Sequence, residues 1–493
     1  MRGAGGLRLA AALLWALAAA GCAASRPAAL RPGAADCRSL LEGLDRAARA
    51  AGCVDAAAAR VPGLPFLRVT RFWTAFSPGE MDGASLRFYA GELARLDREG
   101  RERELACLGK PELAPRAAAC GERLLGAALE APEAFRRRLA GLRVPDDYRL
   151  SMRVLGLYPL VRWPFALAVA HAYAERREWF REDLGALVRD GGWTPARPAA
   201  AGPPLPAGEV AAILRRASRN PLGVPLPSPG EARRLAAAFA PVFVQETVHP
   251  ADRWGAVVPG SGGFRVDGDR PVVYFYLDHL LAGGRPLLRL NYVIWYPERN
   301  GGLTPWFEQG AFDGLTFALV LGPDGRPILG EAMNNCGCYH MEFPAPAVAV
   351  RARPIPFGPD PLVPQALPVP GPGERLAVFL MSGWHQVLRV TAEASAGPGR
   401  RYELRPYAEL ETPAGPGRRF FDGRGVVPGS ERVERFFFFS MGIPAVGSMR
   451  QRGHQPITLL GREHYDDPRR LERHFELRLP AGEAGDGAGP SGE

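Results

Sequence analysis

The residues best suited to chemistry lie together in one short segment, Asn-Asn-Cys-Gly-Cys-Tyr-His-Met-Glu-Phe, which spans positions 334–343. With the two-residue period of a β-strand, the residues that can ligate a metal or titrate share one side: Cys336, Cys338, His340 and Glu342. The aromatic and apolar residues share the other side: Tyr339, Met341 and Phe343. We therefore predict a strand with one chemical face and one face packed in the core.

Two thiolates and an imidazole suit zinc or copper, and Glu342 adds a fourth ligand or a catalytic base. Along a straight strand the Cα atoms of Cys336 and His340 lie about 13 Å apart, too far for one ion with bonds of about 2.0–2.3 Å. A bend at Gly337 would shorten that distance. Alternatively, Cys338 and His340 bind the metal with a distant histidine, for which the candidates are His249, His385 and His454.

Two further interpretations of the segment stay open. In extended chain the Cα atoms of Cys336 and Cys338 lie about 6.6 Å apart, so a turn at Gly337 would allow a strained, oxidising disulfide. This interpretation predicts a thiol–disulfide redox protein. The other interpretation is structural, with two small buried cysteines and a hydrogen-bonded histidine.

The N-terminus indicates export. Arg2 and Arg8 precede and border the apolar run 9–20, which is the order of a secretory signal peptide. The sequence Ala-Ala-Gly-Cys at 19–22 resembles the lipobox of bacterial lipoproteins. The resemblance implies a signal peptide at 1–21, a lipid on Cys22 and a place on the periplasmic side of the cell envelope. Ala23 favours the outer membrane over the inner one, and an ordinary cleaved signal with an incidental cysteine is the alternative.

The composition limits the classes of partner that the protein can bind. Hydrophobic residues make up 47% of the 493 residues and charged residues 23%, which is typical of globular proteins. Lys110 is the single lysine among 61 basic residues, so the many arginines reflect sequence bias and carry little functional information. No basic run indicates nucleic acid. The expected partners are the membrane, through the lipid anchor, and a protein or glycan.

The pattern of elements predicts an α+β protein with a mainly α-helical N-terminal domain followed by a predominantly antiparallel β-rich C-terminal domain. A tether at 22–35 precedes the helical domain at 36–193. A linker rich in Pro, Gly and Ala follows at 194–230, then the β-rich domain at 231–480 and a disordered tail at 481–493. Short β-prone runs separated by turn residues, such as Gly-Pro-Asp-Gly at 322–325, support the β-rich domain.

Four further cysteines fall in the predicted helical domain. If residues 37–51 form one helix, Cys37 and Cys53 lie roughly 24 Å apart, which excludes a bridge between them. Cys107 ends one predicted helix and Cys120 lies in the next, so an antiparallel helix pair predicts a Cys107–Cys120 disulfide. The alternative is two buried free thiols.

The stretch 155–170 is the most apolar part of the mature chain. Pro159, Arg162 and Pro164 interrupt it, so it is too short to span a bilayer. We predict buried core here, in preference to a membrane-facing or partner-facing patch.

An aromatic loop around Trp306, with Glu308 and Asp313 nearby, is typical of a sugar-binding cleft or of paired carboxylates. The chain lacks the nucleophile elbow, the phosphate-binding loop and the dinucleotide fingerprint. The stretches 63–72 and 291–297 and the cysteine segment resemble parts of uncharacterised exported bacterial proteins, which implies no activity. The leading hypothesis is an exported, lipid-anchored envelope protein that binds a transition metal at Cys336, Cys338 and His340, and the alternatives are a non-catalytic binding or scaffold module and a redox protein.

Overall fold

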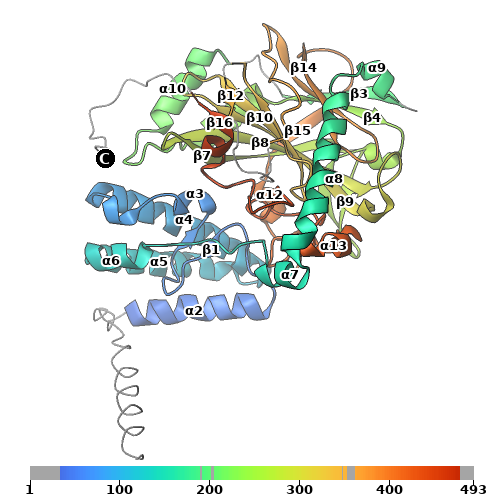
Figure 1. Cartoon of the computed structure of the whole chain (residues 1–493). Helices are drawn as coiled ribbons and strands as arrows, with labels where there is room; N and C mark the ends of the chain where they lie inside the picture. Colours follow the sequence, from blue (N-terminus) through green and yellow to red (C-terminus); the bar gives the residue numbers. More distant parts are fainter. Residues whose placement is uncertain (1–33, 189–190, 201–204, 347, 352–360, 478–493) are drawn as a thin grey trace, which may run out of the picture.

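The computed structural model describes residues 34–188, 191–200, 205–346, 348–351 and 361–477 (Figure 1). The predicted signal peptide, Cys22, most of the tether and the C-terminal tail lie outside the described residues. Helices and one large mixed sheet make up the described chain, so the expectation of a mixed α and β fold is confirmed.

Helices dominate the first part of the chain. They are α2 (Ala34–Ala50), α3 (Arg71–Thr74), α4 (Gly83–Cys107), α5 (Ala114–Leu129), α6 (Pro132–Leu139), α7 (Leu150–Leu155), α8 (Tyr158–Trp179) and α9 (Leu184–Leu187), with the 3-10 turns η1 (Pro78–Glu80) and η2 (Pro111–Leu113) and the short strand pair β1 (Ala59–Arg60) and β2 (Arg68–Val69). The buried residues of α4 recur at helical spacing, for example Leu86, Tyr89, Ala90 and Leu93. Their side chains form a core with α2, α5 and α6, and these helices lie below the sheet in Figure 1.

The four cysteines of this part form the disulfides Cys37–Cys120 and Cys53–Cys107, so the predicted Cys107–Cys120 bridge is wrong. Cys107 is the last residue of α4, whereas Cys120 is the seventh of α5 and lies roughly 9 Å along that helix from its start. Because α2 packs beside α5, its first turn brings Cys37 to Cys120, and Cys53 just beyond its end reaches Cys107. The exclusion of a Cys37–Cys53 bridge is confirmed.

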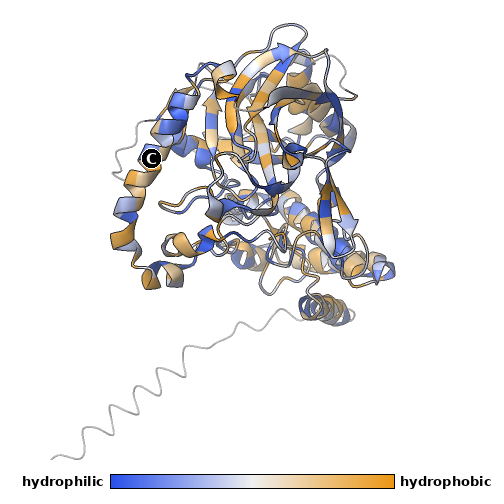
Figure 2. Cartoon of the chain, turned by 90° about the vertical axis from the view of Figure 1, so that its right-hand side faces the viewer, coloured by the Kyte–Doolittle hydropathy of each residue, from blue (hydrophilic) through white to orange (hydrophobic). Residues whose placement is uncertain are grey.

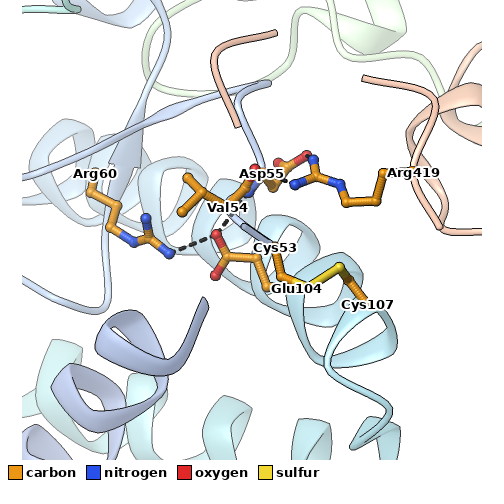
Figure 3. The surroundings of a disulfide bond; sticks show 7 residues. All are labelled: Cys53, Val54, Asp55, Arg60, Glu104, Cys107 and Arg419. Atoms are coloured by element: carbon orange, nitrogen blue, oxygen red, sulfur yellow. Dashed lines mark hydrogen bonds and ion pairs between the residues drawn. A yellow bond between two sulfur atoms is a disulfide. The ribbon is translucent and has the colours of Figure 1, made fainter. Parts of the chain in front are cut away.

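A buried ionic cluster lies beside the Cys53–Cys107 bridge (Figure 3). Glu104 accepts hydrogen bonds from the backbone N–H of Asp55, at 2.9 Å, and from Arg60, at 2.6 Å. Asp55 also lies 3.7 Å from Arg419, which comes from the C-terminal part of the chain. The bridge therefore fixes a loop whose charged groups join the two parts of the molecule.

The large sheet has ten strands in the order β11-β10-β9-β8-β7-β15-β3-β4-β13-β14. They are β3 (Gly192–Pro198), β4 (Val242–Thr247), β7 (Val272–Ala282), β8 (Arg285–Arg299), β9 (Gly310–Leu321), β10 (Pro327–Asn334), β11 (Met341–Pro344), β13 (Glu374–Leu380), β14 (Val387–Ala394) and β15 (Arg400–Pro406). The pairs β4–β13, β3–β15 and β7–β15 are parallel, and the other six pairs are antiparallel. Smaller pairs are formed by β5 (Ala256–Gly260) with β6 (Gly263–Asp267) and by β12 (Ala349–Val350) with β16 (Phe475–Glu476).

The predicted linker at 194–230 is wrong. Strand β3 lies inside the sheet between β15 and β4, and α10 (Ala207–Ala217) buries Val210 and Ile213 in the main core. The remaining helical elements are α11 (Pro229–Ala238), α12 (Ala408–Glu411), α13 (Glu434–Phe437), α14 (Arg470–His474), η3 (Pro250–Asp252), η4 (Trp306–Glu308) and η5 (Phe439–Met441). The Pro- and Ala-rich region therefore forms regular elements. Neighbouring strands and the main core stabilise these elements, and local composition does not reveal such contacts.

Strand β8 shows why its sequence lacks a clear alternation of polar and apolar residues. Leu290, Tyr292 and Ile294 pack in the main core on one face of the sheet, while Val293 and Trp295 pack in a second core on the other face. A central strand covered on both faces must be apolar at consecutive positions.

Helix α8 stands upright against the sheet in Figure 1, with α7 at its foot and α13 beside it. The predicted buried core at 155–170 is wrong, because Leu155, Leu160 and Leu167 are about 70% exposed: 75%, 69% and 72%. Among the residues described, no helix is long and apolar enough to cross a bilayer.

Candidate functional site

The central segment forms the loop between β10 and β11 and then enters β11 at Met341. The predicted strand with a chemical face is therefore wrong for positions 336–340. It holds for β11, where Met341 and Phe343 lie in the main core and Glu342 lies opposite Glu331 of β10.

The loop turns at Gly337, which has a φ of 94°. A Cβ there would lie 2.3 Å from the carbonyl oxygen of Pro456, so only glycine fits. The turn places the backbone N–H of Cys338 3.4 Å from Sγ of Cys336, which accepts its hydrogen bond. Gly337 thus supplies the bend expected from the sequence and brings the two cysteines together.

Both cysteines are free thiols, and the protonation of one depends on that of the other. Burial raises the pKa of Cys336, but the hydrogen bond from the Cys338 thiol and the charge of Arg299 outweigh it, and the pKa is lowered. The hydrogen bond to Cys336 and burial raise the pKa of Cys338 well above its ordinary value. The geometry therefore favours a thiolate stabilised by a neighbouring thiol.

Arg299, the last residue of β8, is buried and pairs with two acids. It makes two hydrogen bonds to Asp313, at 2.9 and 3.0 Å, and a third to Glu308, at 2.9 Å. The same Glu308 accepts hydrogen bonds from Trp384, at 2.9 Å, and from the hydroxyl of Tyr339, at 2.6 Å. The network fixes the loop because Tyr339 follows Cys338 directly.

His385 extends this network away from the cysteines. Its Nδ1 lies 2.8 Å from Asp313 and its Nε2 lies 3.4 Å from Asp252, and its ring stacks on Tyr296 with centroids 3.6 Å apart. Burial lowers the pKa of His385, but the hydrogen bonds to the two carboxylates outweigh it and raise the pKa. His385 therefore lies between two carboxylates that favour its charged form, and it is not placed as a metal ligand beside the thiols.

Backbone strain concentrates around these residues. Phe312, Tyr339 and His385 have φ values of 55°, 56° and 53°, in the left-handed region that non-glycine residues rarely adopt. Each such residue costs of order 1–3 kcal/mol unless the surroundings enforce it, and such residues cluster at functional sites. Three of them in one network mark this region as the strongest candidate site.

The cysteines open into a cavity of about 360 Å³ whose walls are mainly apolar. Its floor is the loop from Cys336 to His340, and one wall is the inner face of α8, including Phe165 and Ala172. Cys338 is partly exposed there, whereas Cys336 is 1% exposed. A small apolar or amphiphilic group can thus reach the thiol pair.

Glu434 of α13 also lines this cavity. Burial, reinforced by the nearby Glu308 and by Cys336, raises the pKa of Glu434 to about 8. The Glu434 charge in turn raises the pKa of Cys338. The site therefore combines a thiol pair with a carboxyl that exchanges protons near neutral pH.

The structure brings Cys336 and Cys338 together but adds no third ligand to them among the described residues. Among the described residues, the group with three ligand atoms within 4.8 Å of one another is Glu331, His340 and Glu342, which contains neither cysteine. Arg470 already pairs with both glutamates, and His474 bonds Glu342 at 2.8 Å. A buried ion-pair network thus occupies the place where a metal would bind, and Glu342 has no access to the cavity as a base.

The other candidate residues are scattered or buried. His454 lies beside Asp147, at 3.3 Å, and His249 directly precedes η3. Trp295 and Tyr296, in the stretch 291–297, are core residues, whereas Trp306 of the aromatic loop is 65% exposed. Sequence reasoning missed Arg299 and Glu434, since the run 433–439 has the pattern of a strand and no local pattern links either residue to the cysteines.

In the comparisons with known proteins, no family model, no curated protein and no solved structure matches this chain.

Proposed function

We propose that this protein is an exported, lipid-anchored envelope protein that carries out thiol–disulfide exchange at Cys336 and Cys338. The proposed layout is a helical N-terminal domain, closed by two disulfides, and a C-terminal domain built on the sheet, in which antiparallel pairs predominate. The observation that supports the activity best is the pair of free, hydrogen-bonded thiols on a tight glycine turn at an open cavity. The other four described cysteines are bridged, which fits an oxidising compartment.

The exchange balances with groups present in the cavity. The thiolate of the pair attacks one sulfur of a substrate disulfide, the substrate S–S bond breaks, and the released thiolate takes the proton of Glu434. The carboxylate of Glu434 then accepts the proton of the second cysteine. That cysteine attacks the mixed disulfide, forms the Cys336–Cys338 bond and releases the second substrate sulfur as a thiolate, which Glu434 protonates. Two electrons and two protons pass to the substrate.

Equilibration with mixtures of reduced and oxidised glutathione tests the activity. We expect mass spectrometry of a digest to show a Cys336–Cys338 disulfide that forms reversibly within the range of known oxidoreductases, about −270 to −120 mV. The Cys338→Ser variant should trap glutathione on Cys336 or lose all exchange. A matched control is Thr74→Ala, a half-buried residue of α3 whose hydroxyl donates within its own helix and that should leave the potential unchanged. If both thiols stay reduced throughout the series, the proposal fails.

The lipid anchor needs a separate experiment. Cys22→Ser should leave the protein exported but without fatty acid, because the thiol of Cys22 is the proposed attachment atom. Radiolabelled palmitate should label the wild type alone. Equal labelling of the variant would contradict the anchor without affecting the redox proposal.

A further inference from the structure

The outer surface of α7, α8 and α13 exposes large apolar side chains. Six of them, between 47% and 75% exposed, define what we call the apolar surface: Leu150, Leu155, Leu160, Trp163, Leu167 and Phe436. In Figure 2, α8 lies along the left edge of the molecule, with orange and blue segments in its lower part. Isolated exposed leucines are ordinary, but a cluster of this kind indicates an interaction site.

The three helices form one continuous support for this surface. Phe165 of α8 contacts Phe438 after α13, with ring centroids 5.6 Å apart. Arg153 of α7 donates to the carbonyl of Met441 at 2.9 Å. A Cβ on Gly156 would lie 2.6 Å from Cα of Ser440, so the backbones approach closely. The apolar surface is therefore a fixed feature of the fold.

Helix α8 is apolar on two opposite faces. Leu160, Trp163 and Leu167 follow one another at helical spacing on the outside, while Phe165 and Ala172 line the cavity on the inside. Burial inside the protein explains the inner face. On the outer face, Leu160 and Leu167 are 69% and 72% exposed and need a different apolar environment.

Charge favours one class of partner. Residues 148–174 contain Arg149, Arg153 and Arg162 but no Asp or Glu. The guanidinium of Arg153 lies 4.4 Å from the ring centroid of Tyr158, and that of Arg162 lies 5.5 Å from Trp163. Leucine and tryptophan beside arginine and tyrosine are typical of helices that lie in the interface of a membrane with anionic lipids.

We propose that the apolar surface docks on an anionic lipid bilayer, with α8 lying in the headgroup region. The surface lies on the outside of a helix, and its side chains can insert into a bilayer. A partner peptide would instead require a groove in this surface. This proposal rests on the proposed envelope location. The twelve residues from Cys22 to Ala34 reach at most about 40 Å, which would hold this surface near the anchored leaflet.

Docking would also place the redox cavity one helix away from lipid. The diameter of α8 with its side chains is about 10–12 Å, and the cavity lies on its far side. An amphiphilic disulfide dissolved in the membrane would then reach the thiol pair with little exposure to water.

Co-sedimentation of the unlipidated Cys22→Ser protein with vesicles tests the surface without the anchor. We expect binding to vesicles of phosphatidylglycerol and phosphatidylethanolamine, and at least tenfold weaker binding of the double variant Leu160→Glu/Leu167→Glu. A matched control is Val369→Glu, since Val369 is 78% exposed and lies outside α7, α8 and α13. This control should bind as the parent does. Thiol exchange in water should be unchanged in all these variants, so a failed redox proposal and a failed docking proposal give different results.

Fluorescence quenching gives a second readout that needs no destabilising change. Brominated lipids should quench part of the tryptophan emission of the bound protein, and Trp163→Phe should remove most of that quenching while binding persists. No vesicle binding by the parent, or equal binding by the double variant, would overturn the proposal. Conversion of a dimer into a monomer by the double variant, seen by analytical ultracentrifugation, would also overturn it by showing that the surface joins two copies.

Discussion

Replacing Glu434 by Gln should make the protein more stable at high pH and should leave its stability near pH 4 unchanged. The folded carboxyl has a pKa of about 8, compared with 4.5 for a free glutamate. The folded state therefore holds a proton that the unfolded state loses above pH 4.5, so stability falls as pH rises from 4.5 to 8. The pKa difference of 3.5 corresponds to roughly 5 kcal/mol in full, as an order of magnitude. The amide of the variant does not titrate, so its stability would lack this dependence on pH.

Urea unfolding at pH 4.5, 7 and 9 measures this effect. The free energy of unfolding of the variant should exceed that of the wild type by several kcal/mol at pH 9 and by little at pH 4.5. Glu409→Gln is a matched control, because Glu409 is an exposed residue of α12 that pairs with Arg405 on the surface. Parallel pH profiles for wild type and Glu434→Gln would refute the buried, protonated carboxyl.

The same substitution should change the reactivity of the thiol pair. The Glu434 charge raises the pKa of Cys338, so its removal should lower the pH at which Cys338 reacts with iodoacetamide. Alkylation followed by mass spectrometry over pH 6–10 resolves the two cysteines. An unchanged pH profile would show that Glu434 does not act on the pair.

Three further predictions concern stability. Replacing Cys37 and Cys120 by serine opens a covalently closed loop of about 84 residues and should lower the free energy of unfolding by about 4–5 kcal/mol in the chain-entropy model. Urea unfolding measures this loss. A non-reduced digest that links Cys107 to Cys120 would contradict the assigned pairs. Phe343→Ala should cost about 3–5 kcal/mol, since the ring is fully buried against Phe180, and an unchanged melting temperature would disprove that packing. Arg470→Met should lower the free energy of unfolding by about 3–5 kcal/mol, because Glu331 and Glu342 lose their shared partner. Treatment with EDTA should not alter the melting temperature of the wild type. A large effect of EDTA would restore the metal hypothesis.

Local periodicity predicts most regular elements. Apolar residues recur at helical spacing in 86–105 and 115–129, where the structure has helices, and the β-prone runs 271–277, 287–296 and 375–380 correspond to strands. The run 433–439 has the pattern of a strand but forms α13 and η5, because its phenylalanines lie against α8 and Trp306 and pair with no strand. Parallel pairing of β15 with β3 and β7 joins segments far apart in sequence, which no short pattern encodes.

The residues of the candidate site also divide into those that local sequence predicts and those that only the fold brings together. The sequence identifies the thiol pair and the bend at Gly337, because both depend on adjacent residues. It does not identify Arg299 or Glu434, and it places Glu308 in a separate aromatic loop, because these residues come from three other elements and meet the cysteines only in the folded chain. It also predicts His340 as a metal ligand with the thiols, whereas the His340 ring lies 3.2 Å from Glu331.

The nested disulfides have a mechanical consequence. Cys37 lies near the start of the described chain and is bonded to Cys120 on α5. The sequence separation of the two cysteines is 83, so 82 residues lie between them. A pulling force applied at the N-terminus would pass through the sulfur atoms directly to α5 and would leave the intervening segment, including the second bridge, without tension. The segment between the two cysteines, about 290 Å long when fully extended, would remain folded under this force. The contacts between α5 and its neighbours would therefore be the first to bear the load.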